Sequence, residues 1–195
     1  MPFRLILPCL LACLLAPLAA VAQTGSVGEA RERFLLSVPE GWVQVTTERR
    51  GDMEMVEFVP QGQEPTAWRD RLTVQVFEGA TNVAAAQFQA NAKAGFERAC
   101  EKVTAGNLQV ARSNGYPSAF FVLGCHRHRQ EGHGETTFFR LIQGYQALYL
   151  VQRAWRTAPY DIQGPPIPQA ERTSAVHLLQ SMSVCLPGEP RHPCP

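Results

Sequence analysis

The sequence has almost no excess of charge and few long apolar runs. Its formal net charge is +1 at pH 7, and loss of Arg4, the one charged residue among residues 1–22, brings the charge to 0. A chain without a charge excess lacks the basic surface that attracts nucleic acid or anionic lipid. After residue 22, no apolar run reaches the roughly 20 residues that a membrane-spanning helix needs. We therefore expect no nucleic-acid partner and no transmembrane segment.

Motifs that carry catalysis are also missing. There is no Gly-x-Ser-x-Gly nucleophile elbow, no Gly-rich phosphate loop and no His-Glu-x-x-His pattern. The cysteines show no Cys-x-x-Cys spacing, which argues against a zinc site formed by four thiolates. His177 has apolar neighbours, a setting in which a structural histidine is more common than a base. These absences predict a protein that is not an enzyme and that needs no cofactor.

The first residues carry an export signal. A positive charge precedes an apolar stretch, and Ala20-Val21-Ala22 has the small side chains of a cleavage site. We predict a signal peptide at residues 1–22, a mature chain that begins at Gln23, and a periplasmic or secreted location. A lipoprotein site at Cys13 is the alternative, but cleavage there would follow too short an apolar segment.

The mature chain keeps an even number of cysteines, because two of the six leave with the signal peptide and four remain. In an oxidising compartment, four cysteines indicate two disulfides. The Pro-rich stretch between Cys185 and Cys194 can close as a short loop, whereas Cys100 and Cys125 fall at the end of a predicted helix and in a predicted strand. This spacing favours one pairing, but the sequence alone does not choose among the three possible connectivities.

Strand patterns dominate the rest of the mature chain. Residues 71–78 alternate between apolar and polar side chains, and Asn114-Gly115 is a strong hairpin-turn signal. Most turns between neighbouring strands are too short for parallel crossovers. The sequence therefore predicts an α+β fold with a mainly antiparallel sheet. Further strands are expected at residues 34–38, 42–47, 53–59, 108–112, 119–128, 136–142 and 147–155.

Two helices are expected to pack on this sheet. Thr81 or Asn82 can cap the first, whose apolar residues recur at every fourth position up to Cys100. The second helix is expected to end at Cys185. The mature chain is thereby divided into a flexible leader at residues 23–32, a single domain at residues 33–185 and a Pro-rich, disulfide-closed tail at residues 186–195.

The order of these elements resembles a known fold. A Pro-x-Gly-Trp turn formed by Pro39, Gly41 and Trp42 follows the first strand, and three early strands, a long helix, a four-strand meander and a C-terminal helix complete the pattern. This order is similar to that of the PsbP-like family, which includes the extrinsic protein of photosystem II, a Ran-binding nuclear import factor and many bacterial exported proteins. The resemblance implies an α/β/α sandwich and an accessory or binding role, without shared catalytic residues.

A group of histidines suggests metal binding as an alternative function. Strand alternation places His126 and His128 on one face, and a hairpin return could bring His133 within reach, which is a set suited to zinc or copper. The adjacent Arg127 and Arg129 oppose a cation. The alternative is thus a periplasmic metal-binding protein, and the simpler interpretation is a solvated hairpin tip.

Two loop aromatics are candidates for a binding surface. Trp68 lies in the loop at residues 60–70, and Tyr160 lies in the loop at residues 159–168. Loops on a rigid scaffold often carry binding sites, and aromatic side chains offer large contact areas. The other interpretation is that both residues pin their loops to the core. The sequence as a whole predicts an exported binding or accessory protein whose partner is an envelope protein or a small ligand.

Overall fold

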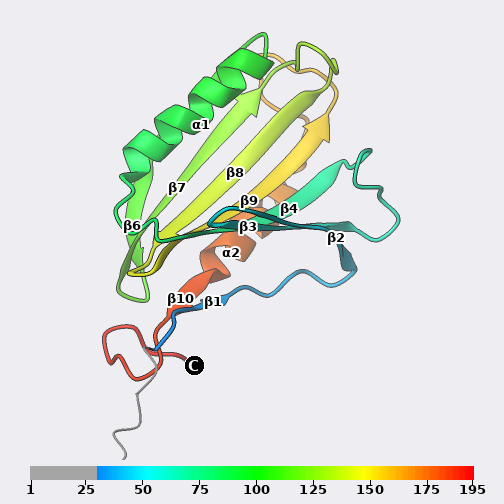
Figure 1. Cartoon of the computed structure of the whole chain (residues 1–195). Coiled ribbons are helices and arrows are strands. Elements are labelled where there is room, and N and C mark those ends of the chain that lie inside the picture. The colour runs from blue at the N-terminus through cyan, green and yellow to red at the C-terminus, as the bar shows by residue number, and fades with distance from the viewer. Residues whose placement is uncertain (1–29) are drawn as a thin grey trace, which may run out of the picture.

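An eight-stranded antiparallel sheet organises the described part of the chain, which is residues 30–195 of a computed structural model (Figure 1). The predicted signal peptide and residues 23–29 of the expected leader lie outside the described residues. The strands of this sheet are β2 (Trp42–Arg50), β3 (Met53–Pro60), β4 (Asp70–Glu78), β5 (Val103–Ala105), β6 (Gln109–Ser113), β7 (Tyr116–Cys125), β8 (Gly134–Gln143) and β9 (Ala147–Thr157).

In the sheet, strands from the first part of the chain meet strands from the second part where β4 pairs with β9. The strand order runs β2-β3-β4-β9-β8-β7, and both β5 and β6 pair with the outer side of β7. The short strands β1 (Arg33–Leu35) and β10 (Ser183–Cys185) form a separate antiparallel pair. All strand pairings within residues 30–195 are antiparallel, so the predicted α+β class with a mainly antiparallel sheet is confirmed.

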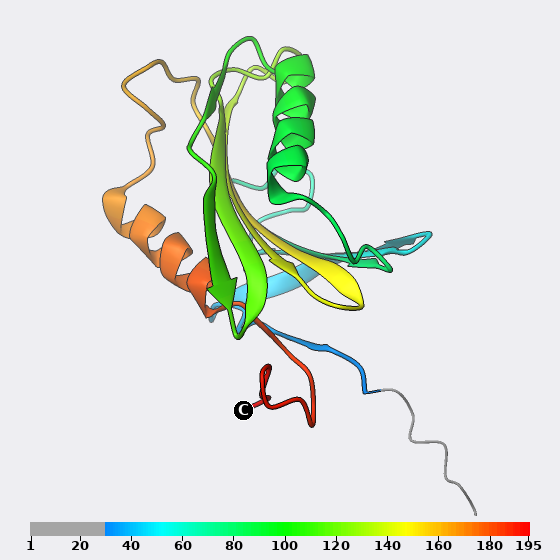
Figure 2. The ribbon, with the colours of Figure 1, turned by 90° about the vertical axis from the view of Figure 1, so that its left-hand side faces the viewer.

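The two helices, α1 (Ala85–Ala99) and α2 (Gln169–Ser181), lie on opposite faces of the sheet (Figure 2). Successive side chains of a strand point to opposite faces, so Phe139 of β8 packs with α1 and Phe138 packs with α2. The α1 core includes Phe121 of β7, and the α2 core includes Leu179 of the helix itself. Among residues 30–195, no helix is both long and apolar enough to cross a membrane.

The ends of several elements differ from the prediction. The last helix ends at Ser181 rather than at Cys185, because Met182 takes an extended backbone and the next three residues pair with β1. The first strand covers Arg33–Leu35 rather than residues 34–38, because only these three residues pair with β10. Neither Thr81 nor Asn82 caps α1, since its N-cap is Ala84 and no described side chain caps it.

Two disulfides join these elements, which confirms the expected pairing of the four cysteines among residues 30–195. Cys100 at the end of α1 is bonded to Cys125 at the end of β7, and Cys185 is bonded to Cys194 in the tail. This is the connectivity that the spacing favours. The first bridge closes a sequence separation of 25 residues and fixes one end of α1 to the sheet.

The start of the described chain is tied to the turn between β8 and β9. The Glu32 carboxylate accepts hydrogen bonds from the backbone N–H of Tyr145 (2.6 Å), the backbone N–H of Gln146 (3.1 Å) and the hydroxyl of Tyr149 (3.1 Å). The side-chain amide of Gln146 donates to the carbonyl of Ala30. Ala30 and Glu32 are thus held by hydrogen bonds, whereas the sequence predicts a flexible leader as far as residue 32.

The tail folds against the hairpin turn between β6 and β7. The His192 ring is buried and stacks on Tyr116 at 3.9 Å between ring centroids. Its Nδ1 lies 2.8 Å from the carbonyl oxygen of Asn114, which can only accept, so Nδ1 carries the proton. In the neutral ring, Nε2 therefore accepts the hydrogen bond from the Tyr145 hydroxyl at 2.8 Å.

Because the tail packs on this turn, alanine should destabilise the protein more at Gly115 than at Gly51, a turn glycine away from the tail. Gly115 and Gly51 both have positive φ, +81° and +57°, so each Gly→Ala change carries about 1 kcal/mol of left-handed backbone strain. A Cβ at position 115 would also lie 2.6 Å from the carbonyl oxygen of Arg191, whereas a Cβ at position 51 meets open space. We expect Gly115→Ala to lower the free energy of unfolding more than Gly51→Ala in urea titrations. Equal losses would show that the tail does not press on this turn.

Candidate functional site

The structure separates the three histidines of the predicted metal site. β7 ends at Cys125, and the chain then bends, so the strand alternation expected to continue to His128 is wrong. His126 packs on Tyr160 at 4.9 Å between ring centroids. His128 stacks instead on His133 at 5.3 Å and lines a hollow beside α1. The trio therefore does not form one site.

The pair that remains does not have the geometry of a metal centre. The His128 and His133 rings are nearly parallel, with 6° between their planes, so their in-plane lone pairs do not converge on one point. His133 lies beside Glu131 (3.4 Å) and Glu135 (4.0 Å), and Arg156 binds Glu131 at 3.3 Å. Within residues 30–195, no group of three or more His, Cys, Asp or Glu residues is placed to hold a metal ion.

The environment of His133 predicts a pH dependence of stability. Burial lowers the pKa of His133 below its usual 6.5, and the positive charge of Arg156 lowers it further against the opposing effect of Glu131 and Glu135. The unfolded chain thus takes up this proton at a higher pH than the folded chain, so protonation favours unfolding. The stability that neutral His133 contributes is present above pH 6.5 and is lost as the pH falls toward the lowered value.

We therefore expect the wild type to lose more unfolding free energy than His133→Gln when the pH is taken from well above to well below 6.5. Urea unfolding at both pH values measures the difference. His177→Gln, which replaces an exposed histidine on α2, is the matched control and should follow the wild type. An identical loss in the wild type and His133→Gln would contradict the assignment.

Trp68, one of the two proposed binding aromatics, is buried rather than presented to solvent. Its side chain is 2% exposed and packs with Val59 and Ala154. The guanidinium groups of Arg71 and Arg156 lie over its ring, at 4.1 and 4.2 Å from the centroid. Such cation–π contacts stabilise a folded chain. Trp68 thus pins its loop to the sheet, as in the second interpretation of the sequence.

Tyr160 is held in a similar way. Its hydroxyl donates to the carbonyl of Glu135 at 2.9 Å and therefore accepts from the hydroxyl of Thr136, also at 2.9 Å. Burial raises the pKa of the Tyr160 hydroxyl, so it remains a donor at neutral pH. Both aromatics fasten loops: Trp68 is buried, whereas Tyr160 is half-buried and lines an open hollow together with Pro159 and Asp161.

Removal of the Trp68 ring should therefore destabilise the protein. We expect Trp68→Ala to lower the free energy of unfolding by about 3 kcal/mol or more, because it leaves a cavity beneath the loop. Ile162→Ala, in the loop at residues 159–168, is the control. Its side chain is 82% exposed, so its loss should change the free energy of unfolding little. Thermal melts of both variants measure the effect, and an unchanged Trp68→Ala melt would restore Trp68 as a surface contact residue.

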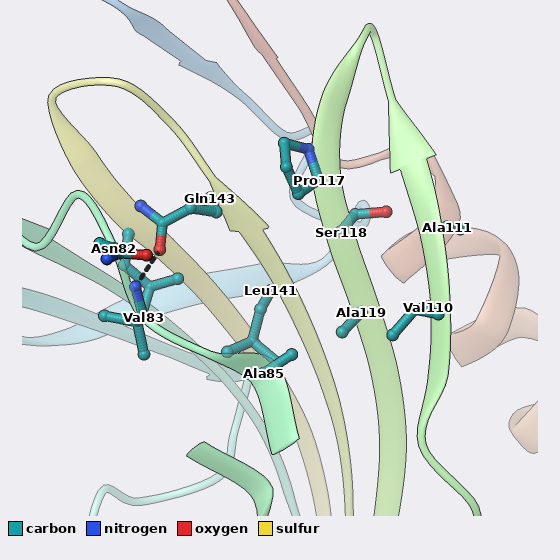
Figure 3. Close-up of a pocket in the computed structure, with 11 residues that line it drawn as sticks. Asn82, Val83, Ala85, Val110, Ala111, Pro117, Ser118, Ala119, Leu141 and Gln143 are labelled. Carbon is teal, nitrogen blue, oxygen red and sulfur yellow. Dashed lines mark hydrogen bonds between the residues drawn. The ribbon is translucent and has the colours of Figure 1, made fainter. Parts of the chain in front are cut away.

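An apolar groove that the sequence did not indicate lies where α1 begins (Figure 3). Its floor is the α1 face of β7, β8 and β9, and its volume is about 270 Å³. No charged side chain occurs among the described residues that line it. The lining residues are Asn82, Val83, Ala85, Val110, Ala111, Pro117, Ser118, Ala119, Leu141, Gln143 and Leu148.

The groove exists because α1 starts too late to cover the whole sheet face. The segment before the helix is held by Gln143, whose side-chain oxygen accepts from the Val83 backbone N–H at 3.0 Å. The side-chain nitrogen of Gln143 donates to the carbonyl of Ala80 at 2.8 Å. Figure 3 shows this clamp on one side of the groove and Val110 on the other.

The polar groups of the groove are amides rather than acids or bases. Asn82 and Gln143 lie at one end, and the Ser118 hydroxyl points away from the hollow in Figure 3. Val110 borders the groove and is 74% exposed, so most of its side chain is open to solvent. The lining can therefore bind an uncharged apolar group, and it offers no side chain for proton transfer.

The course of the chain is similar to that of several solved structures. A search against protein-family models and a search of curated proteins each found no match. The Ran-binding protein Mog1p of Saccharomyces cerevisiae matches 76% of this chain and 83% of its own at 10% identity, with a TM-score of 0.43. LpqN, involved in cell envelope biogenesis of Mycobacterium tuberculosis, matches 80% and 84% at 10% identity, with a TM-score of 0.48. At these values the PsbP-like fold remains a resemblance.

Proposed function

We propose that this protein is an exported, non-catalytic binding or accessory protein of the cell envelope, and that it binds an uncharged apolar group in the groove at the start of α1. The predicted signal peptide and the two disulfides support export, because disulfides persist in oxidising compartments. The partner would be an envelope protein that inserts an apolar side chain, or a small ligand with a short acyl chain.

The observation that carries this proposal is the uncharged, solvent-open lining of the groove. Apolar surface left in water forgoes roughly 25 cal/mol per Å² of burial, so a concave apolar patch commonly marks a binding site. Its volume of about 270 Å³ is near the lower limit of ligand pockets. That size suits one side chain or a chain of several methylene groups rather than a large cofactor.

The state of the polar residues supports a role without catalysis. All four cysteines of residues 30–195 are in disulfides, so none of them supplies a thiolate. The side-chain amide of Asn82 can orient a carbonyl or hydroxyl of the ligand, whereas that of Gln143 is already hydrogen-bonded to the backbone of the segment before α1; neither amide titrates. Binding through contact is the function that this chemistry serves.

A groove-filling variant tests the proposal. Ala119 lies on the floor, so Ala119→Leu should occupy the hollow and weaken binding of the uncharged dye Nile red at least tenfold. Ala105→Leu is the matched control, because it adds the same volume at an exposed position of β5 that does not line the groove. Fluorescence titration gives the affinities, and circular dichroism checks the fold of each variant.

Ala85→Leu fills the same groove from its other wall and guards against a folding defect in Ala119→Leu. Folded Ala119→Leu and Ala85→Leu proteins that bind the dye as tightly as the wild type would refute the groove as the binding site. Loss of binding in both, with Ala105→Leu unaffected, is the expected result.

A further inference from the structure

The outer edge of β6 is open. β6 pairs with β7 on one side, and Figure 2 shows its other side at the near border of the sheet, with α1 and α2 lying to either side of it. Its first four residues are exposed. An open strand edge offers unpaired backbone groups that can pair with another strand.

The backbone groups at this edge can be assigned from the pairing register. Arg112 lies opposite Pro117, which has no N–H, so these two residues cannot exchange two hydrogen bonds. Bonded and non-bonded pairs alternate in an antiparallel ladder, so Val110 occupies the next non-bonded position. The N–H and C=O groups of Val110 and Arg112 thus point away from β7. Within residues 30–195, no backbone hydrogen bond reaches them from another segment.

The opposite edge of the sheet is protected in ways that β6 is not. β2 has an irregular register between Gln44 and Thr46, where a bulge interrupts the ladder. Its last three residues, Glu48, Arg49 and Arg50, are also charged. Bulges and charged residues are devices that prevent edge-to-edge pairing. β6 has no irregular register and one charged residue, Arg112.

We propose that β6 pairs with β6 of a second copy of this chain, antiparallel and with Ala111 opposite Ala111 of the partner subunit. In this register Val110 exchanges two backbone hydrogen bonds with Arg112 of the partner subunit, and the reciprocal pair does the same. The one charge of the strand lies opposite a neutral valine, so no like charges face each other directly. The two alanines at the twofold axis are small enough for the close approach of a non-bonded pair.

The dimer has a consequence for the groove, and this step rests on the proposed function. The twofold axis of such a strand pair is perpendicular to the sheet, so the two α1 faces lie on the same side. Val110 borders each groove and is directly beside the axis. The two grooves would therefore open on one face and could bind two apolar groups of one extended partner.

Sedimentation of the mature chain over a range of concentrations tests the pairing. We expect a reversible dimer, and we expect Ala111→Arg to raise its dissociation constant at least tenfold, because two guanidinium groups would then face each other across the axis. Gln109→Arg is the matched control. It adds the same charge at another exposed position on the same face of β6, opposite a neutral serine of the partner subunit, and should still dimerise.

A cysteine pair tests the register without relying on Ala111→Arg. Opposed Cα atoms in a non-bonded pair are about 4.5 Å apart, which is within disulfide range. Ala111→Cys should therefore form a covalent dimer on oxidation with diamide, whereas Gln109→Cys should not. A wild type that stays monomeric at millimolar concentration, or equal cross-linking of the two variants, would overturn the proposal. Neither result would bear on Nile red binding, which tests the groove separately.

Discussion

The rest of the structure depends on the burial of both faces of the central strands. In β8, Phe138 packs in one core and the adjacent Phe139 packs in the other, because successive side chains point to opposite sides of a strand. A sheet of this kind needs a cover on each face, and α1 and α2 supply them. The covers are unequal. α1 begins only at Ala85, so the part of this sheet face around Ala119 and Leu141 has no helix above it and forms the groove.

The two ends of α1 are held by interactions of very different strength. At its end, Cys100 is bonded covalently to Cys125 of β7. Before its start, the chain is held by hydrogen bonds from Gln143 to Val83 and Ala80, each of which contributes roughly 1 kcal/mol. No described side chain caps the first turn. The end of α1 that borders the groove is therefore held by the weaker interactions.

Local signals in the sequence were enough for the sheet but not for the site. The alternation in β4, the Asn114-Gly115 turn and the even cysteine count each depend on neighbouring residues or on composition, and the structure contains all three features. The pairing of β1 with β10 joins segments about 150 residues apart, so no local pattern indicates it. His126 and His128 are expected on one face only if strand alternation continues past Cys125, where the ladder in fact ends.

The groove cannot be predicted from the sequence, because it too depends on where an element ends. It is defined by where α1 stops covering the sheet, and small residues such as Ala119 have no pattern that distinguishes a cavity floor from a packed core.

Val110 belongs both to the border of the groove and to the open edge of the sheet. Its side chain is 74% exposed and borders the groove, while its backbone N–H and C=O point outward from the edge of the sheet. An exposed valine on a strand is unremarkable alone, since apolar atoms make up much of any protein surface. Val110 lies both at the rim of an uncharged hollow and on a strand edge without a bulge. A ligand in the groove would cover the side chain but leave the backbone groups unpaired, and a second strand would pair the backbone but leave the floor of the groove open. In the proposed dimer, strand pairing and groove binding occur on the same surface, with β6 as their common border.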